Sequence, residues 1–176
     1  MVEVMVAIVI LTVSVYILTS TVTAAIGHSA VKRERSLAVD ASMNLLERMR
    51  AEPFEQVYAR YNSDATDDPD GAGTAPGRHF HVPGLDPDSA DADGFTGEVI
   101  LPEVEVSAGE WQLREDQDLP QLTLPRDLSG DLAIDALDHA DDYLVLPVLV
   151  RVTWDGSSGR RQFEMATMFA QLEKVD

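Results

Sequence analysis

The chain has 176 residues, contains no cysteine and carries a formal net charge of -18, with a pI near 4.3. The lack of cysteine excludes disulfides, thiolate metal sites and a cysteine nucleophile. A chain this acidic repels nucleic acid, because binding to nucleic acid rests on Lys and Arg side chains that neutralise phosphates. We therefore expect no nucleic acid among its partners.

Charge divides the chain into an apolar front and an acidic back. Residues 1–62 carry six basic and six acidic side chains, whereas residues 63–176 carry seven basic and twenty-five acidic ones. The second part therefore accounts for the whole net charge. We expect residues 1–31 to form the transmembrane half of one helix, 32–62 its amphipathic second half, and 63–176 an acidic globular domain rich in β-strands.

The first predicted element is a helix that crosses a membrane. Val4 to Val31 are 28 residues without Asp, Glu, Lys or Arg, and about 20 apolar residues are enough to cross the hydrocarbon of a bilayer. The alternatives are a buried core helix and a secretory signal peptide. A core helix of this length is uncommon in so small a protein. A signal peptide has a basic segment before a shorter apolar region, and neither is present.

The same helix is predicted to continue beyond the apolar run. In SLAVDASMNLLERMR, residues 36–50, apolar side chains recur near helical spacing. Pro53 should end or kink this helix, because proline lacks an amide hydrogen and clashes with the preceding turn. Residues 54–61, FEQVYARY, are predicted as one more short helix. The stripe expected to pack on a globular domain consists of Leu37, Met43, Leu45, Leu46 and Met49.

The acidic part is predicted to form loops and an antiparallel sheet. Residues 63–94 are rich in Asp, Pro, Gly and Ala, which is typical of loops. The clearest strands are 143–154 and 160–171, joined by the turn DGSSG at 155–159. Pro147 places the first of them at an edge or at the start of the paired region. Weaker strands are predicted at 78–82, at 97–106 with a break at Pro102, at 111–114 and at 122–124. A long helix followed by an antiparallel sheet is an α+β fold.

Two acidic stretches and a pair of histidines have the residue types of metal sites. Asp67–Gly71 (DDPDG) and Asp91–Glu98 (DADGFTGE) offer oxygen ligands for calcium, but neither has the EF-hand glutamate at the twelfth position. Solvated turns are the better interpretation. His79 and His81 alternate along a predicted strand and point to zinc, but no third ligand is near in sequence. We expect no metal and no cofactor.

The sequence contains no recognisable catalytic motif. Neither GxGxxG, GxxxxGK[ST] nor GxSxG is present, and His28 and His139 stand alone. Acidic residues are too numerous for any pair to stand out as an acid and a base. We therefore expect a protein that is not an enzyme.

The first twenty-five residues resemble the N-terminus of the type IV pilin and type II secretion pseudopilin superfamily. The signature of that family is a processed Gly, then Phe-Thr-Leu-(Val/Ile)-Glu and an apolar helix. Here Met1 falls at the leucine, Val2 at the next place and Glu3 at the glutamate. The Phe-Thr pair and the glycine-ended leader with its basic residues are expected upstream of Met1.

Two further stretches resemble the minor pilins and pseudopilin I subunits of this superfamily. ERMRAEPF, residues 47–54, is similar to the place where the long helix of those subunits ends. VLVRVTWDGSSGRRQFEMATMFAQ, residues 148–171, resembles their last hairpin. The resemblance implies a pilin-like α+β fold, in which the second half of the long helix packs on an antiparallel sheet.

Glu3 is the residue that the resemblance singles out for assembly. A lone carboxylate in hydrocarbon costs at least about 2.5–3.5 kcal/mol and usually marks function. In the family this glutamate is thought to pair with the N-terminal amine of a neighbouring subunit as the filament assembles. A buried pair offsets the desolvation that one charge alone cannot. The alternative is that Glu3 merely lies in the headgroup layer.

The resemblance implies a minor pilin or pseudopilin, a structural subunit that assembles into or caps a type IV pilus or a type II secretion pseudopilus. Residues 1–31 would then form the filament core. The expected partners are other pilin or pseudopilin subunits, membrane lipid before assembly, and a prepilin peptidase where a leader precedes the chain. The expected location is the cytoplasmic (inner) membrane, spanned once, with the globular domain extracytoplasmic or periplasmic.

Two rival functions stay open. One is a single-pass, membrane-anchored extracytoplasmic domain that binds a ligand, for which Glu3 is dispensable. The other is a membrane-tethered hydrolase, which should show a concave cluster of Asp and Glu with raised pKa values. The orientation has one opposing indication, because Lys32, Arg33 and Arg35 follow the apolar run and positive clusters usually stay cytoplasmic. A basic leader would reverse that balance.

Overall fold

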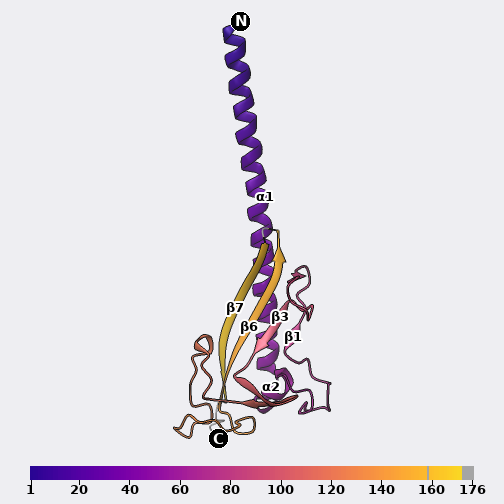
Figure 1. Ribbon diagram of the computed structural model, residues 1–176, viewed down its shortest axis with the longest axis vertical. Coiled ribbons are helices and arrows are strands. Elements are labelled where there is room, and N and C mark those ends of the chain that lie inside the picture. The colour runs from indigo at the N-terminus through magenta and orange to yellow at the C-terminus, as the bar shows by residue number, and fades with distance from the viewer. Residues whose placement is uncertain (158, 172–176) are drawn as a thin grey trace.

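The computed structural model describes residues 1–157 and 159–171. Its first element, α1 (Val2–Ala51), is a single helix of 50 residues, and the rest of the chain forms a domain on the second half of that helix (Figure 1). This confirms the predicted helix of about fifty residues. Together with the antiparallel sheet that follows, it gives the predicted α+β fold class.

Helix α1 ends where proline was expected to end it. Glu52 leaves the helix in an extended conformation (φ -77°, ψ 154°), with its N–H donated to the Met49 carbonyl at 3.3 Å. Pro53 disfavours the helical region for the residue before it, so Glu52 is held out of the helix. The chain turns at this point and forms the second predicted helix, α2 (Phe54–Tyr61).

One long hairpin dominates the sheet. Strands β6 (Val145–Gly156) and β7 (Gly159–Ala170) pair along their full length in antiparallel register. The two predicted strands are therefore confirmed, and β6 extends into the predicted turn. Residue 158 of that turn lies outside the described residues.

Three shorter strands complete this sheet. The far edge of β6 pairs with β3 (Gly97–Ile100) and, nearer the hairpin tip, with β2 (Asp86–Pro87), while β1 (His79–Phe80) pairs with β3. Pro147 precedes the residues of β6 that pair with β3, as expected of a proline at the start of a paired region. The short β2 was not predicted.

The weaker predicted strands have mixed outcomes. The chain breaks near Pro102, and β4 (Glu103–Ser107) forms a separate two-stranded sheet with β5 (Glu110–Leu113). The strand predicted at 78–82 shrinks to β1. The strand predicted at 122–124 is wrong, because Pro120–Leu122 forms a 3-10 turn, η1. Thr123 then takes a left-handed conformation (φ 61°), which lies outside the β region of the backbone map.

The second half of α1 packs on the sheet through a narrow face. Its buried residues are Ala38, Ser42, Leu45, Leu46 and Met49. The predicted stripe is wrong at Met43, which is 50% exposed. Small side chains at 38 and 42 instead face the strands, and the Ser42 hydroxyl donates to the Ala38 carbonyl at 2.8 Å. The buried hydroxyl is thus satisfied within the helix.

The core fills the space between this helix face and the hairpin. Alternate residues of β6 point at α1 and are at most 3% exposed, namely Leu146, Val148, Val150, Val152 and Trp154. One cluster of buried side chains surrounds Met49 and α2, and a smaller one surrounds Ala38 and Trp154 near the hairpin tip. The domain therefore has its own core, and α1 belongs to that core only through its second half.

Candidate functional site

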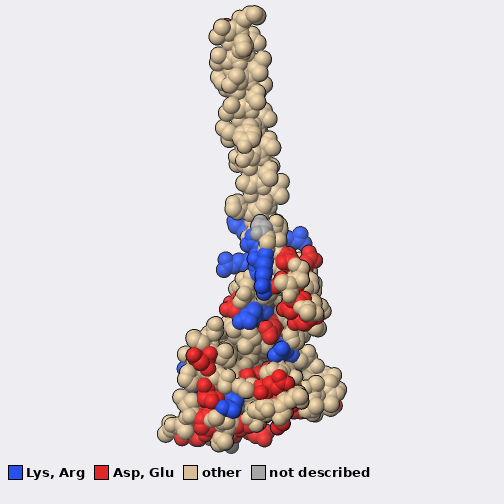
Figure 2. All heavy atoms as spheres, in the orientation of Figure 1, with Lys and Arg blue, Asp and Glu red and all other residues tan. Residues whose placement is uncertain are grey.

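The first half of α1 is an apolar rod that projects from the domain, as Figure 2 shows. Every residue from 1 to 29 is exposed, and burial begins at Ala30. An 18-residue window in this helix has a mean hydropathy of 2.4 with none of it buried, so the rod is long and apolar enough to cross a membrane. Contiguous apolar surface of this extent marks an interaction surface.

Five hydroxyl side chains of the apolar rod are bonded within the helix. Each donates to the carbonyl oxygen four residues earlier, at 2.8 to 3.0 Å; they are Thr12, Ser14, Thr19, Thr21 and Thr23. In an apolar surrounding an unsatisfied hydroxyl is costly, and this local bond removes that cost. The rod is therefore suited to lipid or to other helices in spite of its Ser and Thr content.

Glu3 lies in the first turn of α1, as the acidic residue of that turn. A carboxylate is favoured here, because the free amides at the start of a helix carry partial positive charge. Among the described residues no hydrogen bond or ion pair involves Glu3, which sits at the tip of the rod far from the domain (Figure 1). The predicted assembly residue therefore lies on the surface, where another molecule can contact it.

Glu34 ties the domain to α1 at the point where the apolar rod ends. Its carboxylate accepts the indole N–H of Trp154 at 3.3 Å and the backbone N–H of Ser157 at 3.3 Å, and it lies 3.6 Å from Nε of Arg161. Desolvation opposes ionisation, but these bonds and the Arg161 charge prevail and hold the pKa of Glu34 below its usual value. The tip of the β6–β7 hairpin is thereby fastened to the helix.

Gly156 leaves room for the Glu34 carboxylate and the Arg161 side chain, which a larger residue would displace. A Cβ built at this glycine would lie 2.6 Å from Oε2 of Glu34 and 2.8 Å from Cδ of Arg161. This contact was not predicted from the sequence. Its only local signal is the single acid within the basic run KRER, residues 32–35.

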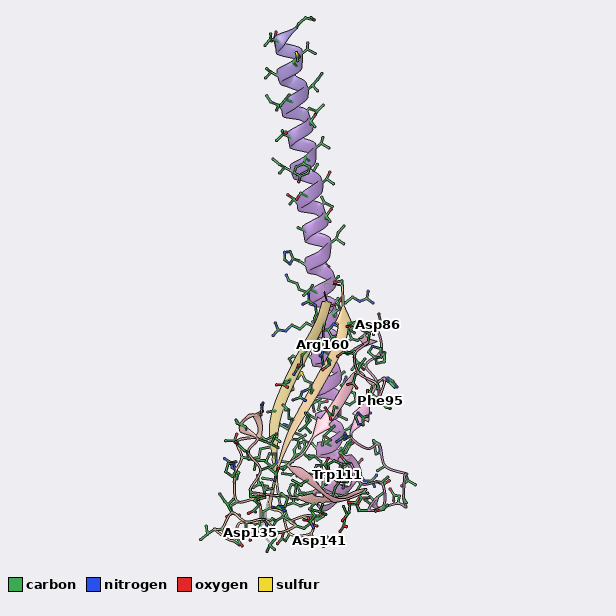
Figure 3. All side chains as sticks on the ribbon, in the orientation of Figure 1. Asp86, Phe95, Trp111, Asp135, Asp141 and Arg160 are labelled. Atoms are coloured by element: carbon green, nitrogen blue, oxygen red, sulfur yellow. The ribbon has the colours of Figure 1, made fainter. Side chains whose placement is uncertain are left out.

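A cavity of about 490 Å³ lies between the loop 62–78 and β5. Its lining includes Arg78, Phe95 and Trp111, and the Arg78 guanidinium lies 5.7 Å from the centroid of the Trp111 ring. Figure 3 places Trp111 and Phe95 on the domain well below the apolar rod. This is the type of cavity that a small ligand or a peptide side chain occupies.

Two carboxyl groups with shifted pKa values contact residues that line this cavity. Burial raises the pKa of both Asp67 and Glu103. Asp67 accepts a hydrogen bond from Asn62 at 2.7 Å, and Glu103 accepts bonds from the hydroxyl and the backbone N–H of Ser63. These bonds turn the two groups toward the protein, where they hold the loop that starts at residue 62.

A buried histidine is surrounded by acids at the far end of the domain. His139 Nδ1 lies 3.0 Å from Asp142, and its Nε2 lies 3.3 Å from Asp135 and 3.7 Å from the buried Glu115. Burial lowers the pKa of His139, but the bond to Asp142 and the charge of Glu115 outweigh burial and raise it. Asp135 and Asp142 are near His139 in the sequence, but acids are so common in this part of the chain that they did not stand out, and Glu115 is distant along the chain.

The residues weighed as metal ligands have other roles. Asp68 accepts the backbone N–H of Ala75 at 3.1 Å, and Asp93 accepts that of Phe95 at 2.8 Å, so these acids close their own turns. The rings of His79 and His81 lie on Phe95, with centroids 5.2 and 4.6 Å from it. Within residues 1–157 and 159–171 no group of three or more His, Cys, Asp or Glu could hold a metal ion.

Comparison with known proteins gives no match: no family model, no characterised protein and no solved structure is similar to this chain at a significant level.

Proposed function

We propose that the chain is a minor pilin or pseudopilin, a non-catalytic subunit that is anchored in the cytoplasmic membrane by α1 and assembles through the same helix. The observation that carries the proposal is the division of one unbroken helix into an apolar rod and a packed half. A helix that is apolar on all sides needs lipid or other helices around it. The packed half already has its partner in the sheet.

Glu3 supports assembly in addition to anchoring. A pair between Glu3 and a neighbour's N-terminal amine would set the register between staggered helices. At the membrane surface Glu3 is hydrated, but among the apolar helices of a filament core a lone charge is costly, so the paired arrangement is the stable one there. The acidic domain would then lie on the outside of the filament, in the periplasm or beyond.

The test replaces Glu3 in the full chain, expressed with its leader in a host that assembles the filament. For Glu3→Gln and Glu3→Ala we expect at least a roughly tenfold loss of the chain from sheared filaments, with the membrane-bound amount unchanged. Glu47→Gln, an equal loss of charge at an exposed position of α1, serves as the control. Normal incorporation of both Glu3 variants would contradict the proposal.

The DNA upstream of Met1 gives an independent test. We expect an in-frame leader with basic residues that ends in glycine and is followed by Phe-Thr. A reading frame closed immediately before Met1, together with purified chain that stays in solution without detergent, would overturn both the anchoring and the assembly.

The cavity beside Trp111 favours a second candidate function, a membrane-anchored extracytoplasmic domain that binds a ligand. Its volume of about 490 Å³ is within the range of small-molecule sites. The same Glu3 experiment separates the two candidates, because an anchored binding domain keeps its membrane attachment and has no filament to lose. For the pilin proposal, Asp67 and Glu103 are structural groups of a loop and carry out no chemistry.

A further inference from the structure

A different cavity lies where the apolar rod meets the domain. It measures about 410 Å³ and is lined by Val31, Arg35, Trp154, Arg161, Gln162 and Phe163. Val31 is the last residue of the uncharged run of α1, whereas Arg161 and Phe163 come from β7. Two arginines from separate elements therefore meet an apolar wall in one cavity, directly beside the rod.

These arginines have hydrogen-bond donors to spare. In the described part of the chain no carboxylate lies within 4.0 Å of Arg35, Arg33 or Lys32. The Nε of Arg161 is buried 3.6 Å from Glu34, and within the described residues the two terminal nitrogens of its part-exposed guanidinium have no hydrogen-bond or ion-pair partner.

The nearby acids are largely engaged already. Glu34 accepts bonds from Trp154 and Ser157, and Asp88 holds Arg160 at 2.7 Å. The remaining positive charge is visible as the band of blue side chains just below the rod in Figure 2. This band of positive charge would therefore attract an anion.

The band also lies at the depth of lipid headgroups. From Glu3 to Lys32 a helix rises about 43 Å at 1.5 Å per residue, and a bilayer with its headgroups is about 40–45 Å thick. With Glu3 at one surface, Lys32 to Arg35 reach the headgroup layer of the opposite leaflet. The β6–β7 hairpin tip is held at the same depth by Glu34.

We propose that the cavity between α1 and β7 binds the phosphate of an anionic phospholipid in the leaflet next to the domain. Arg35 and Arg161 donate to the phosphate oxygens, because the planar guanidinium matches phosphate geometry. Val31 and Phe163 line the apolar side, where an acyl chain begins. Lys32 and Arg33 add attraction to neighbouring headgroups. This inference rests on the proposed anchoring by α1, but it requires no filament.

The test uses the full chain in nanodiscs of equal parts phosphatidylglycerol and phosphatidylcholine, with the lipids that stay bound counted by native mass spectrometry. We expect phosphatidylglycerol to be retained preferentially by the native sequence. Arg35→Gln with Arg161→Gln should reduce that preference by about fivefold for each charge removed. The matched control is Arg48→Gln with Arg50→Gln, the same loss of charge two turns or more into the packed half of α1, and should leave the preference unchanged.

Each outcome decides the point. Equal retention of both lipids by the native sequence overturns the lipid site, even when the chain assembles normally in the Glu3 experiment. An equal loss of the phosphatidylglycerol preference in the Arg48→Gln, Arg50→Gln control would show that the cavity is not the site.

Millimolar inorganic phosphate should fail to displace the lipid; displacement would mean that the site binds free phosphate. If the arginine pair instead weakens cross-linking between copies and leaves lipid retention intact, the surface belongs to a protein neighbour and the proposal is wrong. A chain that never enters the nanodisc contradicts the anchoring itself.

Discussion

The apolar rod and the packed domain share one helix, yet they meet opposite surroundings. In the rod, apolar side chains point in all directions and every residue is exposed. In the second half of α1 the buried face is narrow, and charged residues such as Glu47 and Arg48 occupy the other side. A helical backbone alone therefore does not specify what the helix packs against. A helix with apolar side chains on one narrow face can bury that face against its own domain. A helix with apolar side chains on all sides needs lipid or other helices around it.

Two leucine substitutions test the contrast between the rod and the packed half of α1. Leu46 is 5% exposed and Leu11 is 65% exposed. We expect Leu46→Ala to lower the free energy of unfolding of the domain by about 2–5 kcal/mol, because it opens a cavity in a close-packed core. Leu11→Ala should leave that free energy unchanged. The measurement is urea unfolding of the full chain in nanodiscs, followed by tryptophan fluorescence. Equal effects of the two variants would mean that the rod also packs on the domain.

A tyrosine pair sharpens the comparison at a polar contact. The Tyr143 hydroxyl donates to the Phe54 carbonyl at 2.6 Å and accepts the Tyr58 N–H at 3.3 Å, and so joins the sheet to α2. Burial raises the pKa of Tyr143 to about 12, so its hydroxyl remains a donor even at strongly alkaline pH. Tyr143→Phe should cost about 1–3 kcal/mol, since the buried N–H of Tyr58 loses its acceptor and the part-buried carbonyl of Phe54 loses a donor. Tyr16→Phe, on the exposed rod, should cost nothing in the same unfolding assay.

Domain stability should also depend weakly on pH through His139. The pKa of His139 is raised in the folded domain, so its stabilising contribution is complete below its unfolded value of about 6.5 and is lost as pH rises through the folded pKa. Thermal midpoints should therefore fall by a few degrees more in the native sequence than in His139→Gln as pH is raised from about 6 to about 9. His28→Gln, on the rod, should follow the native curve. If the thermal midpoints of all three proteins change with pH in the same way, His139 does not contribute to the pH dependence of domain stability.

Local signals in the sequence were sufficient for the main elements of the fold. The uncharged run, the helical spacing up to Met49 and the stop at Pro53 all act within a few residues, and α1 has the predicted length. The β6–β7 hairpin was equally accessible, because two β-rich runs flank a short turn. The errors at Met43 and at 122–124 have non-local causes. The face of α1 that the sheet covers, and the turn η1 under the hairpin, depend on packing that the pattern does not contain.

One of the candidate sites could likewise be predicted from the sequence, and the others could not. Glu3 is conspicuous because it is alone in an apolar run, and its position at the tip of α1 follows from the helix. The bond between Glu34 and the hairpin tip joins residues more than a hundred positions apart. The same is true of the cavity that brings Arg35 to Arg161. Spacing along the chain carries no information on such pairs, so only the folded structure brings them together.

The continuity of α1 has a mechanical consequence. Between Val2 and Ala51 the helix contains no proline and one glycine, Gly27, so it passes from the rod into the core without a loop that could act as a swivel. Its buried residues and the Glu34 bond hold it to β6 and β7 over several turns. A force or a torque applied at Glu3 would therefore be transmitted along the rigid helix to the sheet. The orientation of the domain would follow the direction of the helix axis.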